Sequence, residues 1–334
     1  MRKEPPLAKL TRRSLIAAPL ALGPLACPAY AQAPWPTRPI RIVIPFGTGG
    51  GTDITTRLLA PKMAEILGQP VVLENRPGAG GVVGTDYVAK QPPNGEVFVL
   101  STLSPIALAR GLPAPVPFDA RTDLVAVAPT VFVPIALAVT TRNFAPTTAA
   151  EFIATLKAAP GRYQYGSSGI GTSGHIASAS FCVRTGTDAV HVPYRGGGQV
   201  FTALTAGEIQ FCCDIPSLLK GFQDAGTARV LFVATDQRSS LLPNVPTAAE
   251  AGIAGYKSHS WYGFFAPRGT PAAIVARLAA ATEQALSDQA INQRFEEMGT
   301  PAMRGYTPER FAAYVRDEIA FWEPEVRSLG IKAE

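Results

Sequence analysis

The stretch IRIVIPFGTGGGTDITTRLLAPKMAEILG, residues 40–68, carries three structural signals in one run. Its first six residues are mainly β-branched and predict a buried strand over residues 40–45. Apolar residues recur at helical spacing over residues 52–67, and Gly68 supplies the left-handed stop that ends many helices. Four of the five residues from 47 to 51, between these elements, are glycine. Strand, glycine loop and helix in this order form the opening unit of a parallel α/β sheet.

The same alternation continues along the chain and then restarts. Further strands of a first sheet are predicted over residues 71–74, 97–101 and 124–128. A second sheet is predicted from strands over 135–140, 163–166, 189–193, 209–214 and 229–234, with helices such as 148–159 and 174–185 between them. The apolar run 124–139 is too short to span a membrane and contains Pro129 and Pro134, so two buried strands joined by a bend account for it.

The last part of the chain is expected to return to the first sheet. A strand over residues 261–266 is followed only by helices, over 271–287, 289–298 and 308–329. We therefore expect domain 1 to comprise residues 32–131 with 256–334, and domain 2 to comprise residues 132–255. Each domain is an open, mainly parallel α/β sheet flanked by helices, and the two form a clam-shell with its cleft at the carboxyl ends of the strands.

Length and composition exclude several classes of protein. At about 150 residues per domain, 334 residues predict two domains. A chain with 47% hydrophobic and 16% charged residues is not intrinsically disordered. Most of the net charge of +5 comes from residues 1–31, which hold five bases and one acid; the remainder has 25 bases and 24 acids. That near-neutral remainder lacks the clustered basic surface that nucleic-acid binding requires, so no nucleic-acid partner is expected.

Residues 1–31 are typical of an export signal. Thr11-Arg12-Arg13-Ser14-Leu15-Ile16 has the twin-arginine pattern, and Ala29-Tyr30-Ala31 is a cleavage site of A-x-A type. The apolar stretch between them is too short for a membrane anchor. Cys27 leaves a lipoprotein signal open, although Pro24 stands where such a signal prefers leucine. We expect cleavage near Ala31 and a soluble mature protein in the periplasm.

The loop after the first strand is the first candidate site. Glycines let the backbone turn its N–H groups outward, and the helix that follows places its positive end there, so an anion such as a carboxylate is favoured. Thr52 or Asp53 as a plain helix cap is the alternative. The candidate ligand-binding residues of this loop are Phe46, Gly47, Thr48, Gly49, Thr52 and Asp53.

A second loop of the same kind lies in the second domain. Gly169, Gly171 and Gly174 match the dinucleotide pattern G-x-G-x-x-G, but the next strand does not end in the acid that would hold a ribose. Hydroxyl groups in this loop suit a carboxylate equally well. Its candidate ligand-binding residues are Ser167, Ser168, Gly169, Thr172 and His175. His175 either donates to the ligand or only caps and packs, and both readings stay open.

Motifs for catalysis and metal binding are absent from the sequence. It has no G-x-S-x-G elbow and no P-loop. Asp53, Asp86 and Asp214 are separate acids of a type more often found as caps than as catalysts. Three histidines and the odd set Cys182, Cys212 and Cys213 predict neither a metal site nor a disulfide framework; we expect buried, apolar thiols and no cofactor.

Several motifs, in order along nearly all of the mature chain, resemble those of the Bug solute receptors, the binding-protein component of tripartite tricarboxylate transporters. They are WPTRPI (35–40), PF (45–46), GG (49–50), TD (52–53), ENRPGAGG (74–81), GSSG (166–169), GT (171–172), His175, VPYRG (192–196), LPNVPT (242–247), WYG (261–263) and AP (266–267). Ala179, where the family usually has an acid, and the pair Cys212-Cys213 depart from the pattern.

The resemblance implies a two-domain Venus-flytrap fold, that of periplasmic binding proteins, which binds a small carboxylated solute without chemistry. In that family the ligand carboxylates are held by backbone N–H groups and water at the two glycine loops, and Asp214 at the end of a neighbouring strand completes the candidate set. The expected partners are an organic acid and either membrane transporter subunits or a sensor domain, and the receptor itself is expected to be a monomer. An exported NAD(P)-dependent oxidoreductase that uses the Gly169/Gly171/Gly174 loop is the main alternative, and an exported hydrolase is a third.

Overall fold

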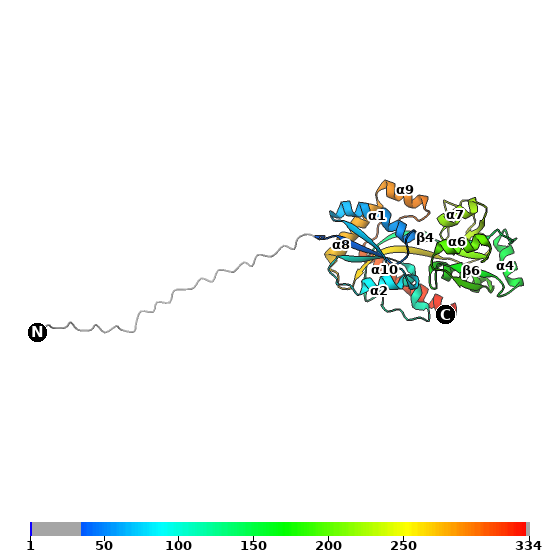
Figure 1. The fold of residues 1–334 in the computed structure, drawn as a ribbon, viewed down its shortest axis with the longest axis horizontal. Coiled ribbons are helices and arrows are strands. Elements are labelled where there is room, and N and C mark those ends of the chain that lie inside the picture. The colour runs from blue at the N-terminus through cyan, green and yellow to red at the C-terminus, as the bar shows by residue number, and fades with distance from the viewer. Residues whose placement is uncertain (2–34, 332–334) are drawn as a thin grey trace. The chain divides into compact units, whose positions relative to one another are not determined.

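Two five-stranded sheets form the framework of the protein (Figure 1). The computed structural model describes Met1 and residues 35–331, so the predicted export signal, with Arg12-Arg13 and the cleavage site at Ala31, lies outside the described residues. The first sheet has the strand order β2 (Val71–Asn75), β1 (Ile40–Ile44), β3 (Val97–Thr102), β10 (His259–Pro267) and β4 (Leu124–Pro134). The second has the order β7 (Val190–Pro193), β6 (Gln164–Ser167), β8 (Phe211–Asp214), β5 (Ala136–Thr140) and β9 (Ala228–Val233).

Each sheet is mainly parallel and contains one reversed strand. In the first sheet β1 pairs in parallel with β2 and β3, whereas β10 runs antiparallel to both β3 and β4. In the second, β6 pairs in parallel with β7 and β8, and β5 is antiparallel to β8 and β9. The reversed strand is in each case the one that enters its sheet directly from the other. These sheets confirm the predicted α/β fold class.

The chain passes between the sheets twice. The apolar run after Leu124 divides into β4 and β5, in different sheets, with only Ile135 between them. The strand predicted over 261–266 returns to the first sheet as β10, where Phe264 lies opposite Leu100 on one side and Ala128 on the other. The division expected after residue 131 falls inside β4, which stays in the first sheet as far as Pro134.

Ten helices cover these sheets within the described residues. Their bounds are α1 (Gly51–Leu67), α2 (Val82–Ala89), α3 (Leu103–Ile106), α4 (Ala149–Ala158), α5 (Ser173–Thr185), α6 (Gly197–Ala206), α7 (Pro216–Asp224), α8 (Ala272–Leu286), α9 (Gln289–Glu297) and α10 (Pro308–Ser328), with short 3₁₀ helices at Ala79–Gly81 and Leu108–Gly111. In Figure 1, α4, α6 and α7 gather around the second sheet, whereas α1, α8 and α9 lie with the first. No helix in residues 35–331 combines the length and apolarity needed to cross a bilayer.

Alternating side chains of the first sheet enter different cores. Ile42, Phe98 and Phe264 are fully buried in a cluster that includes residues of α1 and α8. Val43 and Phe265 are buried on the opposite face, in a cluster that includes residues of α10. This period of two is the expected property of strands covered on both faces.

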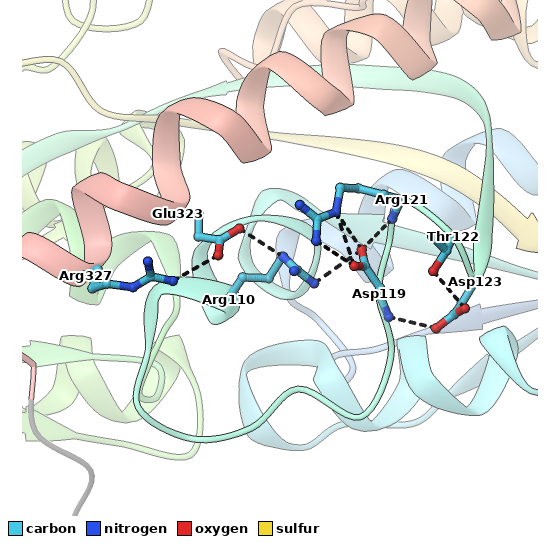
Figure 2. Close-up of polar contacts among 7 residues, drawn as sticks. All are labelled: Arg110, Asp119, Arg121, Thr122, Asp123, Glu323 and Arg327. Carbon is cyan, nitrogen blue, oxygen red and sulfur yellow. Dashed lines mark hydrogen bonds and ion pairs between the residues drawn. The ribbon is translucent and has the colours of Figure 1, made fainter.

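An ion-pair cluster fastens the segment before β4 to α10, as Figure 2 shows. The Arg110 side chain, 17% exposed, lies between Asp119 and Glu323, at 3.3 Å from an oxygen of each. The segment between Arg110 and Asp119 is thereby held at both ends. Leu112, at its start, reaches the second glycine loop, because a methyl group on Gly171 would lie 2.6 Å from the Leu112 Cδ1 atom.

Candidate functional site

A cavity of about 620 Å³ lies where strand ends of both sheets meet the starts of several helices. Hydroxyl groups, glycine backbone and a few apolar side chains make up most of its wall. The lining residues are Phe46, Gly47, Thr48, Gly49, Gly50, Gly51, Thr52, Thr102, Ser104, Val133, Ile135, Ser168, Thr172, Ser173, Gly174, Arg195, Gly196, Gly197, Gly198, Phe201, Cys213, Asp214, Ile215, Leu218, Ser260 and Tyr262. Its volume is in the range of small-molecule sites.

Three helices that follow glycine loops begin at this cavity without a side-chain cap. The N-cap positions of α1, α5 and α6 are Gly50, Thr172 and Gly196, and no side chain accepts a hydrogen bond from the first turn at any of them. By contrast, α4 and α10 begin elsewhere and are capped by Thr148 and Thr307. The first N–H groups of a helix need an acceptor and carry the positive end of its dipole. The cavity therefore offers several free donors to an anion.

In the first glycine loop, Asp53 supports the loop and does not line the cavity. Its carboxylate is buried and accepts the Gly49 N–H at 2.9 Å, the Arg57 Nε–H at 2.9 Å and the Asn75 Nδ2–H at 3.0 Å. Burial disfavours the charged form, but the hydrogen bonds from Arg57, Gly49 and Asn75 together hold the pKa of Asp53 below its ordinary value. Asp53 thus stays ionised and fixes Gly49, whose φ of +78° favours glycine.

The second glycine loop is supported in the same way by His175. Its Nδ1 atom accepts the Gly171 N–H at 3.0 Å, and Gly171 has a φ of +76°. In both loops the supporting side chain comes four residues after the supported glycine. The His175 ring stacks on His191 with centroids 3.8 Å apart, and His191 Nε2 lies 2.7 Å from the Ser167 hydroxyl oxygen. Burial lowers the pKa of His175 to about 3 and that of His191 to about 4, so both rings are neutral.

The predicted ligand-binding residues therefore fall into two groups. Eight line the cavity: Phe46, Gly47, Thr48, Gly49, Thr52, Ser168, Thr172 and Asp214. Four are not among the lining residues: Asp53, Ser167, Gly169 and His175. In this structure His175 packs on His191 and accepts a hydrogen bond from the loop, and its donation to a ligand stays a prediction. Asp53 is no N-cap of α1, since that position is Gly50.

Sequence reasoning missed a third loop of the site. Residues 195–198, at the end of β7 and the start of α6, line the cavity with one arginine and three glycines. The sequence has the same order of strand, glycines and helix at this loop as at the other two, and this order was the signal that could have found it. Tyr262 on β10 was missed as well, and no local signal points to it: its hydroxyl oxygen would lie 2.6 Å from a methyl group placed on Gly51.

Charged side chains are few at the cavity. Arg195 is the only basic lining residue and Asp214 the only acidic one. Arg195 forms no ion pair with any residue of the 35–331 region. The Oδ1 atom of Asp214 accepts the Ile215 N–H at 2.8 Å. Burial raises the pKa of Asp214 to about 6.

The thiols and the metal-binding side chains offer no reactive centre in the described part of the chain. Cys182, Cys212 and Cys213 are free and buried, as predicted. Burial raises the pKa of Cys182 to about 11 and that of Cys213 to about 12, so both stay protonated. Residues 35–331 contain no cluster of three His, Cys, Asp or Glu side chains arranged to hold a metal ion.

The family model of the tripartite tricarboxylate transporter family receptor matches residues 55–331. The chain belongs to that receptor family. It is 34% identical to protein BugT of Bordetella pertussis over 316 residues, which cover 94% of this chain and 95% of that one. A UPF0065 protein from Pseudomonas sp. strain P51 is also 34% identical, over 330 residues that cover 96% of this chain and 95% of that one. The resemblance to the Bug receptors is confirmed.

Solved structures agree with this assignment. MatC of Rhodopseudomonas palustris, solved with bound malate, is 31% identical and superposes with a TM-score of 0.82 over 87% of this chain and 99% of its own. A second R. palustris protein, solved with adipate, is 34% identical, with a TM-score of 0.83 over 89% of this chain and 99% of its own. The two-lobe fold of the solute-binding receptors is therefore confirmed, and the oxidoreductase alternative gains no support from these relatives.

Proposed function

We propose that this receptor binds a small organic acid between its two lobes and releases it unchanged. The observation that carries the proposal is the convergence of the uncapped starts of α1, α5 and α6 on one cavity. Backbone N–H groups at a helix start bind a carboxylate through hydrogen bonds and through the dipole, without any need for a basic side chain. The malate and adipate found in two related structures are ligands of this chemical class.

Closure of the lobes would follow from contacts that the ligand makes with both. We place the division between the lobes at Ile135, after β4, and between β9 and β10. The first lobe supplies the Thr48–Thr52 side of the cavity, and the second supplies Ser168 and Thr172. Ser104 and Ser173, one from each side, are already 3.3 Å apart at their hydroxyl oxygens. A ligand held by both lobes favours the closed state, because only that state provides both sets of donors.

Export and presentation complete the proposal. The receptor would leave the cytoplasm by way of its twin-arginine signal, lose residues 1–31 and act in the periplasm as a monomer. Its closed form would be presented to membrane transporter subunits or to a sensor domain. Periplasmic binding proteins such as BugD, 27% identical with a TM-score of 0.83, support this location.

The test is to identify what the purified protein carries. Mass spectrometry of the ligand released by denaturation should find a carboxylic acid, and calorimetry should show that the same acid rebinds to the emptied protein. Small-angle scattering should report a smaller radius with the acid than without it. Bound NAD(P), or conversion of the acid into a product during prolonged incubation, would contradict the proposal.

A further inference from the structure

Asp214 is an isolated acid in a cavity that otherwise suits anions. It is the only carboxylate among the lining residues, beside three uncapped helix starts. Its side chain is only partly exposed, and a carboxylate removed from water requires hydrogen bonds to compensate. No Lys or Arg of residues 35–331 forms an ion pair with it.

One oxygen of this carboxylate has no partner in the described part of the protein. Oδ1 accepts the Ile215 N–H at 2.8 Å, and no hydrogen bond reaches Oδ2 from any residue between 35 and 331. Oδ2 lies beside Gly197, since a methyl group placed there would be 3.9 Å from it. Residues 196–198 are all glycine, so this loop itself adds no side chain between the oxygen and the cavity.

The same cavity also contains a phenol. Tyr262 lines the same cavity as Asp214. Its pKa is raised first by burial and then by the charge of Asp214, so the two side chains interact within this cavity. A ligand carboxylate placed there would face Asp214 and be repelled. A hydroxyl or ammonium group placed there would donate to Oδ2 and leave the ligand carboxylate for the helix starts.

We propose that Asp214 selects organic acids that carry a hydrogen-bond donor, a hydroxyl or an ammonium group, on the carbon chain. This inference rests on the proposed function, because it assumes that the carboxylate of the ligand binds at the helix starts. It also gives the ligand one orientation: the carboxylate of the ligand lies toward α1 and α5, and its hydroxyl or ammonium group lies toward Oδ2 of Asp214.

Matched triples of acids test the inference on the unaltered protein. Calorimetry would compare succinate, malate and aspartate; glutarate, 2-hydroxyglutarate and glutamate; and 3-phenylpropionate, phenyllactate and phenylalanine. Within the triple that fits the cavity, a member with a donor should bind at least about ten-fold more tightly than the plain acid. Equal binding of the plain acid would overturn the inference and leave the proposed function standing. Binding of none of the nine would overturn both.

A variant pair then assigns the effect to one side chain. Asp214→Asn keeps the shape and removes the charge, and it should reduce the preference for the donor-bearing acid by about ten-fold or more, chiefly through the ammonium forms. Asp236→Asn is the control, because Asp236 is outside the cavity and pairs with Lys257 at 2.7 Å. An unchanged preference in Asp214→Asn would show that Tyr262 or another group recognises the donor, and would overturn the role of Asp214.

Discussion

The stacked histidines behind the second glycine loop should make the receptor lose stability in mild acid. Burial is the main reason that the pKa of His175 lies at about 3 and that of His191 at about 4, against 6.5 for a free histidine. The unfolded chain therefore binds more protons than the folded one below pH 6.5, and stability falls as the pH drops through that value. From pH 7 to pH 5 each ring should lower the free energy of unfolding by about 2 kcal/mol, and the pair should lower it by about 4 kcal/mol.

Asp214 works in the opposite direction over the same range. Its pKa of about 6 exceeds the ordinary value of 3.8, so the folded state binds more protons than the unfolded chain between these values, and stability rises as the pH falls toward 5. That gain is about 1 kcal/mol between pH 7 and pH 5. The three groups together should reduce the free energy of unfolding by about 2 to 3 kcal/mol.

Urea denaturation of the emptied protein at pH 7, 6 and 5 measures this dependence. In Asp214→Asn the free energy of unfolding should fall by about 4 kcal/mol between pH 7 and pH 5, because the opposing contribution of the Asp214 carboxyl group is gone. In His191→Gln the free energy of unfolding should fall by about 2 kcal/mol less than it does in the wild type, since one of the two buried rings is removed. A free energy of unfolding that stays level from pH 7 to pH 5 in the wild type, or a slope that His191→Gln leaves unchanged, would refute the view that burial holds the rings neutral.

Three further changes probe how the cavity holds its ligand. Arg195→Ala should weaken binding of the identified acid no more than Ser168→Ala does, by calorimetry, because backbone donors carry the charge; abolition by Arg195→Ala alone would contradict this. Asp53→Asn should lower affinity by about one to two decades without touching the ligand, since it loosens the support of the first loop, and a normal affinity would show that Arg57 and Asn75 suffice. Gly51→Ala should also weaken binding by about ten-fold or more, because its methyl group would lie 2.6 Å from the Tyr262 hydroxyl oxygen, and Tyr262→Phe should restore part of that loss; tight binding by Gly51→Ala alone would show that Tyr262 moves aside freely.

Asp53 and His175 hold similar glycine loops, but Asp53 does so as a charged side chain and His175 as a neutral one. Each side chain accepts a backbone N–H from a glycine four residues earlier. Asp53 has Arg57 and Asn75 beside it, so a charge is stabilised there. His175 is buried and stacked with the rings of His191 and Tyr165, so the neutral form is the stable one.

The sequence by itself predicted most of the strands, the two sheets and two of the glycine loops that line the cavity. A period of two in the strands, a period near 3.6 in the helices and glycine at their junctions are local properties, and they predicted β1, α1, β6 and α5 to within a residue or two. The glycine loops after β1 and β6 line the cavity because each follows the carboxyl end of a strand, β1 in the first sheet and β6 in the second, and these strand ends meet at the cavity.

Only the tertiary structure decided which side chains of these loops line the cavity. Asp53 and His175 stand one turn into their helices, where local pattern allows either direction, and the packing of Asn75 or His191 behind each one settles it. Tyr262 reaches Gly51, more than half of the chain away in sequence, only because β10 inserts antiparallel between β3 and β4. Contacts between residues so distant in sequence depend on long-range packing, which no local spacing records.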